Sequence, residues 1–213
     1  MDFELSEEQR LLADAVIRFL DQRYDFEQRK AIVRSETGAS EIVWQQLAEF
    51  GVLALPFSEA SGGLGGGAVD LIGTMQALGA ALVVEPVLAT VLAGRLIDRV
   101  ASPDARAALL GPVIAGRSRL AFAHSEDGAR MATCASRAGD GWVLNGLKRV
   151  VIDAPLADRL VVSATTAAGG VSLFILIRNL SQHAHPLMPF FDSGLVFATS
   201  TMRLAMRLRR SNR

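Results

Sequence analysis

Cysteine is almost absent from this chain of 213 residues, in which Cys134 stands alone. A single thiol excludes an internal disulfide and any cysteine-rich zinc or iron–sulfur site. An excess of charge of one sign is also missing, because 22 basic residues balance 22 acidic ones and the sequence pI is ≈ 6.8. This balance gives no indication of a nucleic acid or of an anionic membrane as a partner.

A long, uninterrupted apolar run is missing as well. Residues 160–177 carry no charge, but serines and threonines interrupt them and Gly169-Gly170 lies in their middle. Pro86 divides the other apolar stretch, residues 71–94. Two strands around a turn therefore explain residues 160–177 better than a membrane helix does. The N-terminus has neither the basic flank nor the apolar run of a signal peptide, so we expect a cytoplasmic protein without a membrane partner.

What the chain has in its N-terminal part is helical periodicity. Ser6 followed by Gln9 is a capping box, and apolar residues recur at helical spacing from Leu11 to Leu20. Gly51 is a candidate C-terminal cap for the next apolar pattern, which begins at Ile42. Further helices are predicted from Val69, over residues 86–100 and over residues 103–115.

After Gly116 short β-rich runs replace the helical pattern, and the turn dipeptides Asp140-Gly141 and Asn145-Gly146 separate them. The predicted strands cover residues 119–124, 141–144, 149–152, 159–163 and 171–177. Helices followed by strands predict the α+β class. We predict a helical domain over residues 1–117, a β-domain over residues 118–180 and an atypical basic tail over residues 181–213.

The tail allows three interpretations. Beyond Asp192 it contains five arginines and no acidic residue. A solvated or disordered basic tail, a short helix anchored by Leu204, Met206 and Leu208, and a contact to nucleic acid or membrane all fit this composition. His183 and His185 would share one face of a strand, but no third ligand stands at a suitable spacing, so we predict no metal site.

Two further features invite a catalytic interpretation that their surroundings do not support. The glycines between Gly62 and Gly67 do not fit G-x-G-x-x-G, and no Lys-Ser/Thr pair follows them, so we predict a surface loop rather than a phosphate site. Ser125 lacks the G-x-S-x-G surroundings of a hydrolase nucleophile. From residue spacing alone the function stays open.

Several segments together do resemble a known family. The segments MDFELSEEQRLLADAVIRFL, WQQLAEFGVLALPFSEASGGLGGGAVD and QALGAALVVEP resemble the N-terminal helical domain of the acyl-CoA dehydrogenases. LAFAHSEDGAR and GWVLNGLKRVVIDAPLADRLVVSA resemble the start of their middle β-domain. The resemblance covers residues 1–177, and the pimeloyl-CoA dehydrogenase small-subunit type is the most similar subgroup.

The resemblance implies a fold and an activity. The fold would be an all-α domain followed by a partial, β-barrel-like middle domain. The activity would be FAD-dependent oxidation of an acyl-CoA thioester to the 2-enoyl-CoA, as in fatty acid β-oxidation, with hydride passing to the flavin and a glutamate removing the α-proton. In the family that glutamate lies on a later helical domain. The expectation is therefore a truncated chain without a catalytic base, its arginine-rich end arising from a frame shift or premature end.

The resemblance also implies partners: an acyl-CoA substrate, an electron-acceptor flavoprotein, and a homo- or hetero-oligomer with a family member. Two alternatives stay open. One is a non-catalytic subunit or remnant that binds a homologous partner, and the other is a small module that binds an acyl chain or CoA without redox chemistry.

Two family motifs supply the candidate site residues by resemblance. The motif aromatic-x-x-Thr-Glu corresponds to residues 122–126, where Ser125 keeps the hydroxyl and Glu126 is expected to be structural. In the motif Asn-Gly-x-Lys-x-Trp-Ile-Thr-Asn, Val150 replaces the tryptophan and Ile152 the threonine. The predicted cofactor-binding residues are thus Phe122, His124, Ser125, Val150 and Ile152, and the predicted substrate-binding residues are Arg130 and Met131. Gln76 stands where the family more often has glutamate.

Overall fold

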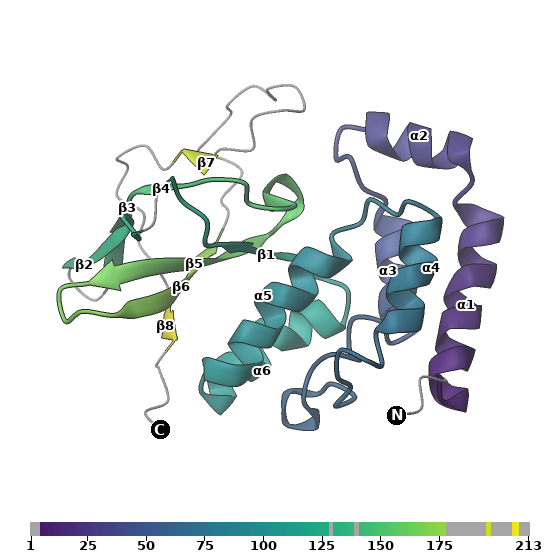
Figure 1. The fold of residues 1–213 in the computed structure, drawn as a ribbon, viewed down its shortest axis with the longest axis horizontal. Coiled ribbons are helices and arrows are strands. Elements are labelled where there is room, and N and C mark those ends of the chain that lie inside the picture. The colour runs from purple at the N-terminus through teal and green to yellow at the C-terminus, as the bar shows by residue number, and fades with distance from the viewer. Residues whose placement is uncertain (1–4, 128–129, 139–140, 178–194, 197–205, 209–213) are drawn as a thin grey trace. The chain divides into compact units, whose positions relative to one another are not determined.

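A computed structural model describes residues 5–127, 130–138, 141–177, 195–196 and 206–208 of the chain (Figure 1). The α+β class is confirmed, since helices precede a mixed sheet along the chain. The chain forms two compact units: Met1–Val87 with Arg106–Arg117, and Leu88–Ala105 with Ser118–Arg213. The domain ranges predicted from the sequence, 1–117, 118–180 and 181–213, remain predictions.

The first unit contains helices whose starts are encoded locally. α1 (Glu7–Arg23) begins at the predicted capping box of Ser6 and Gln9. A second capping box, formed by Asp25 and Gln28, starts α2 (Phe26–Arg34), a separate helix that was not predicted from the sequence. The remaining helical elements of this unit are α3 (Glu41–Glu49), the 3-10 helix η1 (Glu59–Ser61), α4 (Ile72–Ala80) and the part of α6 (Pro103–Ile114) from Arg106 onward.

A buried carboxylate ties the helices of this unit together. Glu85 is only 5% exposed, and its two oxygens accept hydrogen bonds from the Tyr24 hydroxyl at 2.9 Å and the Ser40 amide at 2.8 Å. The Tyr24 oxygen in turn accepts from the Val84 amide at 3.0 Å. Burial, together with the neighbouring Glu85 carboxylate, raises the pKa of the Tyr24 hydroxyl. The turn before Pro86 is therefore held from two separate helices.

The glycine-rich segment folds back onto the turn that precedes it. The amides of Gly63, Gly65 and Gly66 donate to backbone carbonyls of residues 55–58, so these amides already have partners. A Cβ atom on Gly63 would lie 2.3 Å from the Phe57 carbonyl oxygen. The loop predicted from composition is thus a tightly packed one, and only glycine fits at its closest approach.

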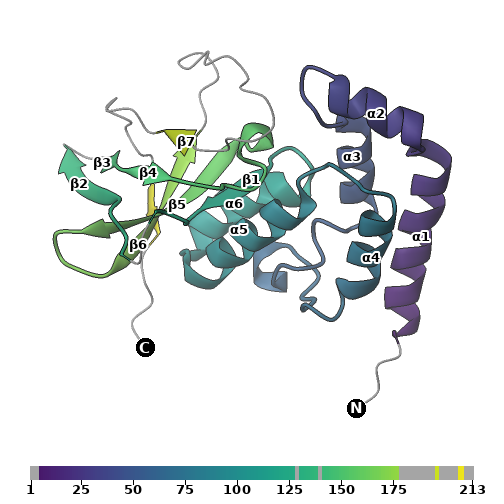
Figure 2. The same cartoon turned by 45° about the horizontal axis from the view of Figure 1, so that its top comes forward.

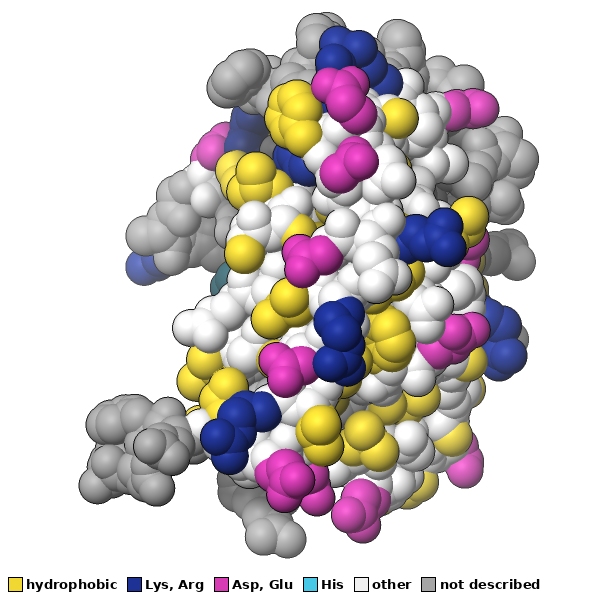
Figure 3. Space-filling view, turned by 90° about the vertical axis from the view of Figure 1, so that its right-hand side faces the viewer, with side chains coloured by type: hydrophobic (Ala, Val, Ile, Leu, Met, Phe, Trp, Pro, Cys, Tyr) yellow, Lys and Arg dark blue, Asp and Glu magenta, His cyan; other side chains and the backbone are white. Residues whose placement is uncertain are grey.

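The surface of the first unit mixes side chains of all kinds. Figure 3 shows apolar side chains interspersed with acidic and basic ones. Leu11 and Ile17 of α1, which are 59% and 42% exposed, are among the apolar residues at the surface. Scattered apolar side chains of this kind are common on soluble domains.

The second unit is built on a six-stranded sheet with the strand order β3-β2-β5-β6-β8, in which β1 also pairs with β5. β5 has paired strands on both edges (Figure 2), and its residues from Leu160 to Ala164, including Ser163, are buried. The strands are β1 (Leu120–Ala123), β2 (Cys134–Ala138), β3 (Gly141–Asn145), β5 (Arg159–Thr166), β6 (Val171–Ile177) and β8 (Met206–Leu208).

Helix α5 (Val87–Val100) belongs to this unit from Leu88 onward. The Thr90 hydroxyl donates to the Leu120 carbonyl at 3.3 Å and accepts from the Leu120 amide at 3.1 Å, which joins the helix to β1. The core of the sheet includes the edge-to-face pair of Trp142 and Phe174, whose ring centroids are 5.4 Å apart. No helix among the described residues is long and apolar enough to cross a bilayer.

One predicted strand, residues 149–152, is wrong. β4 (Leu147–Lys148) ends before it and pairs with β7 (Leu195–Val196), and the chain then turns into the 3-10 helix η2 (Ala154–Leu156). Val150 has φ +51°, which is incompatible with an extended strand. β2 was not predicted, since its sequence CASRA is short and mostly exposed.

Most of the predicted basic tail, including His183 and His185, lies outside the described residues. Met206 and Leu208, which one interpretation of the sequence placed on a short helix, instead lie on β8, which pairs with β6 in antiparallel fashion. The helical interpretation of residues 206–208 is therefore wrong, because the sheet edge supplies backbone partners for an extended segment.

Candidate functional site

The candidate site is built around a loop that leaves the sheet and returns to the same strand edge. β1 ends with Ala123 opposite Val162 of β5, and β2 begins with Cys134 opposite Thr165, so both strands run parallel to β5 along one edge. The described residues between them, 124–127 and 130–133, belong to the loop that joins β1 to β2. The Thr133 carbonyl accepts from the Thr165 amide at 2.9 Å and anchors the returning end. Four of the predicted site residues lie on this loop: His124, Ser125, Arg130 and Met131.

A fully buried cation lies beneath the loop. The Lys148 side chain is 0% exposed, and its ammonium group donates to three oxygens. These are Glu126 Oε1 at 2.5 Å, Ser163 Oγ at 3.1 Å and the His124 carbonyl at 3.2 Å. An ammonium has three N–H groups, so every donor of Lys148 has a partner. Burial of a charge is tolerated only when it is paired in this way.

Glu126 closes the loop upon itself. Its carboxylate accepts from the Ala132 amide at 2.5 Å and from the Thr133 amide at 3.2 Å, in addition to Lys148. Burial by itself raises the pKa of Glu126, but the hydrogen bonds from the Lys148 ammonium and from the Ala132 and Thr133 amides outweigh it and hold the pKa at about 2. The carboxylate is therefore a structural anion, in agreement with the structural role expected from the sequence.

We expect the stability of the second unit to depend on pH through Glu126. The pKa is lowered from 4.5 to about 2 on folding, so the stabilisation is fully present above pH 4.5 and is lost as the pH falls toward 2. Urea unfolding measured between neutral pH and about pH 3 should show this decline. It should be weaker in Glu126→Gln and unchanged in Glu36→Gln, which alters an exposed glutamate. An equal decline in the Glu126→Gln protein would contradict the assignment.

Two exposed apolar side chains stand beside the loop. Val150 and Ile152 are 69% and 56% exposed, whereas the intervening Val151 is 1% exposed and belongs to the core. The Arg149 amide donates to the Ser125 carbonyl at 2.8 Å, which brings this segment alongside the loop. A β-branched residue with positive φ, such as Val150, is strained, and strain of this kind clusters at binding and catalytic sites.

The structure brings the predicted cofactor-binding residues into one neighbourhood. The rings of Phe122 and His124 stack with centroids 5.3 Å apart and an interplanar angle of 16°. His124 and Ser125 are exposed. Arg130 is exposed and Met131 is half-buried, both on the far part of the same loop, and their predicted role in substrate binding stays a prediction.

Sequence reasoning gave no role to Lys148 or Ser163. Lys148 stands within the second motif, so its position was visible, but a lysine in a β-rich segment is usually exposed.

Two other carboxylates lie near the site. Asp127 makes an ion pair with Arg149 at 2.5 Å near the surface, and burial raises the pKa of the Asp153 carboxyl at the start of η2. Among the described residues, no group of three or more His, Cys, Asp or Glu side chains could hold a metal ion.

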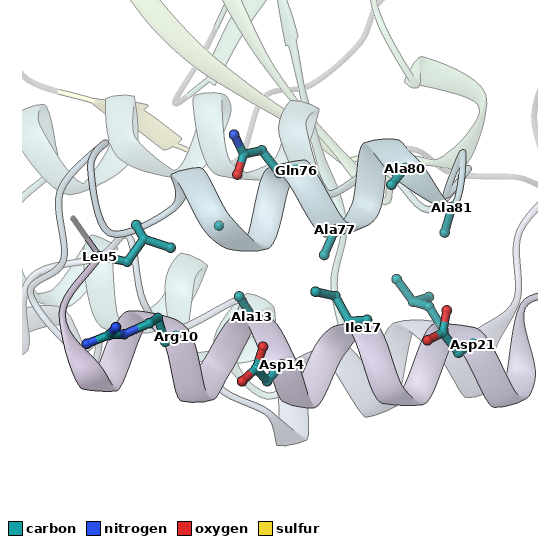
Figure 4. A pocket seen from close by; sticks show the side chains of 12 residues that line it. Leu5, Arg10, Ala13, Asp14, Ile17, Asp21, Gln76, Ala77, Ala80 and Ala81 are labelled. Atoms are coloured by element: carbon teal, nitrogen blue, oxygen red, sulfur yellow. The ribbon is translucent and has the colours of Figure 1, made fainter. Parts of the chain in front are cut away.

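A separate groove of about 500 Å³ lies between α1 and α4 in the first unit (Figure 4). Small side chains such as Ala13 and Ala77 line its floor, and the charged groups of Arg10, Asp14 and Asp21 lie along α1. Gln76 is the one residue of the groove that the motif comparison had singled out. None of the predicted cofactor- or substrate-binding residues lines it.

Two features indicate what kind of site the sheet carries. They are the loop that joins β1 to β2 and the two exposed apolar side chains of Val150 and Ile152. The chain is an α+β protein whose sheet carries a candidate site for a flat ligand with a polar edge, because a loop closed by hydrogen bonds adjoins two exposed apolar side chains.

The family model for the acyl-CoA dehydrogenase N-terminal domain matches residues 6–117, more than half of the chain. The chain belongs to the acyl-CoA dehydrogenase family. The match covers the helical part of the sequence, and the family resemblance inferred from the motifs is confirmed.

Sequence and structural similarity to known proteins supports this family membership. Benzylmalonyl-CoA dehydrogenase from Aromatoleum aromaticum is 27% identical over 177 residues, which are 77% of this chain and 45% of that protein. The ChsE4-ChsE5 complex from Mycobacterium tuberculosis contains a chain with TM-score 0.74 and 26% identity, covering 83% of this chain and 49% of that one. PigA with FAD and proline has TM-score 0.70 and 27% identity, covering 84% and 50%. The chain thus spans about half the length of the relatives it matches.

Proposed function

We propose that this chain forms part of an FAD-dependent dehydrogenase that oxidises an acyl-CoA thioester to the 2-enoyl-CoA. The observation that carries the proposal is the position of Val150 and Ile152. Both are exposed, and the hydrogen bond between Arg149 and Ser125 joins them to the loop that holds the first flavin motif. Two motifs that are separate in the sequence therefore form one surface.

The chemistry of this surface fits a flavin. The ring system of FAD has flat apolar faces and a polar edge, so it needs an apolar wall and nearby hydrogen-bond donors. Val150 and Ile152 would supply the wall, and the Ser125 hydroxyl and the His124 ring would face the polar edge. When bound, FAD supplies the acceptor for the hydride that leaves the β-carbon of the thioester. PigA, with which this chain shares its fold, is described with FAD.

The two carboxylates of the loop, Glu126 and Asp127, are both engaged in ion pairs. Glu126 is held in its ion pair with Lys148, and Asp127 is paired with Arg149. Neither is available to remove the α-proton, and, as the family resemblance implies, we propose a glutamate outside the described residues as the base. What the described residues contribute is position: the closed loop fixes Ser125 and its neighbours, and preorganisation of this kind lowers the cost of binding.

The test is direct. The full chain, purified as expressed and titrated with FAD, should quench flavin fluorescence, and anaerobic addition of acyl-CoA thioesters should bleach the flavin absorbance if the base is also present. Val150→Asp and Ile152→Asp, which place charge on the proposed wall, should weaken FAD binding at least about tenfold. Equal FAD affinity of the wild type and both variants would contradict this site, as would a folded wild-type chain that binds no FAD.

A second candidate function is that of a subunit that pairs with a homologous chain. Two observations favour it: the carboxylates of the site are engaged in ion pairs, and the similar ChsE chain is part of a complex of two named proteins. Light scattering of the chain alone and with a co-expressed family member would show whether a hetero-oligomer forms. A monomer under both conditions would argue against this candidate.

The finer expectations from the sequence extend the proposal. Arg130 and Met131 would lie on the substrate side of the loop, and a basic side chain there suits a dicarboxylyl thioester. An electron-acceptor flavoprotein would reoxidise the flavin, and the cytoplasm would be the site of this step in β-oxidation. Fatty acyl-CoA and dicarboxylyl-CoA substrates, compared in the bleaching experiment, separate the two substrate classes.

A further inference from the structure

A chain of hydrogen bonds runs from the buried cation to the exposed ring of His124. Lys148 donates to Ser163 Oγ at 3.1 Å, and Ser163 Oγ lies 2.9 Å from His124 Nδ1. All three residues belong to the second unit. The direction of each hydrogen bond in this network follows from the number of donor protons on each group.

Lys148 fixes the first direction, because an ammonium group donates and never accepts. Ser163 Oγ therefore accepts from Lys148, and its own proton has two acceptors within reach. These are His124 Nδ1 at 2.9 Å and the Ala123 carbonyl at 3.5 Å. In the opposite arrangement, Nδ1–H would donate to Ser163 and the serine proton would go to the Ala123 carbonyl, at the outer limit of hydrogen-bond length. A hydroxyl polarised by the Lys148 ammonium donates better to a nearby imidazole nitrogen, so we assign Ser163 as the donor to His124 Nδ1. The assignment comes from the bonding network, as tautomers in general do.

We propose that Lys148 and Ser163 fix the tautomer of His124 that carries its proton on Nε2, and that this N–H is a hydrogen-bond donor for the polar edge of the bound flavin. With Nδ1 turned toward the buried Ser163, Nε2 lies on the opposite side of the ring. His124 is exposed, and Nε2 has no acceptor among the described residues. Stacking on Phe122 holds the ring plane.

The inference rests on the proposed function, since it names a residue that would contact the flavin. His124 would be a binding residue, whereas Lys148 and Ser163 would be positioning residues that act through it. The same network explains the buried cation: Lys148 orders the loop through Glu126 and orients the ring through Ser163.

The first experiment measures the tautomer without flavin. The full chain, labelled with ¹⁵N and studied at mildly alkaline pH, should show His124 with a protonated Nε2 and an unprotonated Nδ1. His124→Gln identifies the signal among the three histidines. Ser163→Ala should give a mixture of both tautomers, while Ser136→Ala, which removes an exposed hydroxyl from β2, should change nothing. Protonated Nδ1 in the wild type would overturn the assignment.

The second experiment tests the donor role by titration with FAD. Gln places an N–H near the position of Nε2, whereas Asn reaches only the position of Nδ1. We expect FAD to bind His124→Asn about three- to tenfold more weakly, as for one lost hydrogen bond, and His124→Gln within about twofold of the wild type. FAD should also shift the His124 Nε2–H resonance.

The outcomes separate the two proposals. If wild-type chain binds FAD and His124→Asn binds it equally well, the donor role is overturned and the proposed function stands. If the folded wild-type chain binds no FAD, the proposed function and the donor role both fail, while the nitrogen spectra still decide the tautomer. Thermal unfolding of each variant shows that the protein compared is folded.

Discussion

Replacing Lys148 with methionine is expected to lower the free energy of unfolding of the second unit by about 3–5 kcal/mol. The substitution removes the cation but leaves the Glu126 carboxylate, which is 6% exposed, buried without its partner. Native domains have a margin of about 5–15 kcal/mol, so the variant should be close to unfolding at room temperature. Urea unfolding followed by the fluorescence of Trp142, which lies in the core of the sheet, measures the change.

Two controls separate the buried charge from a general effect of losing a lysine. Lys30→Met breaks an exposed ion pair with Glu27 and should cost less than about 0.5 kcal/mol. Lys148→Met combined with Glu126→Gln removes both charges and keeps an acceptor for the loop amides, so it should be more stable than Lys148→Met alone. A loss below about 1 kcal/mol for Lys148→Met would show that water reaches this cation.

Gly63→Ala is expected to lower the free energy of unfolding of the first unit by more than about 3 kcal/mol. The new methyl group would lie 2.3 Å from the Phe57 carbonyl oxygen and 2.7 Å from that of Ala54, and backbone atoms at such distances cannot move aside cheaply. The substitution would also disrupt the hydrogen bond from the Gly63 amide to the Ser58 carbonyl. Chemical unfolding followed by Trp44, which lies in the core of this unit, measures the loss.

Gly79→Ala is the matched control for this prediction. Gly79 lies within α4, and no atom is within 4 Å of the position of an added Cβ. Since alanine favours the helix over glycine, this variant should be about 0.5–1 kcal/mol more stable than the wild type. If Gly63→Ala and Gly79→Ala changed stability alike, the close packing of the glycine loop would be disproved.

Local signals made much of the fold predictable. The capping box at Ser6 and the apolar run of β5 each report a short-range preference, and the structure agrees with both. The capping box at Asp25 was equally visible, but it lies beyond the apolar pattern of residues 11–20 from which the first helix was predicted. The backbone of Val150 could not be foreseen, because its positive φ results from contacts that the fold imposes on a residue of high β-propensity.

The site was predictable to a smaller extent. Motif resemblance identified the residues that surround it, but the exposure of Val150 and Ile152 on either side of the buried Val151 follows from the turn after β4, which the sequence did not predict. Resemblance could not reveal the partners of Lys148, since Lys148 lies on β4, His124 and Glu126 lie on the loop after β1, and Ser163 lies on β5. Such a network depends on how β1, β4 and β5 assemble, which no local pattern encodes.

The return of residues 124–133 to the strand edge that they left has an evolutionary consequence. β1 and β2 are aligned independently along β5, so an insertion between Glu126 and Ala132 would alter the loop without shifting the register of either strand. The ion pair with Lys148 would still close the base of a longer or shorter loop. Ligand preference can therefore diversify in this segment while the sheet keeps its alignment.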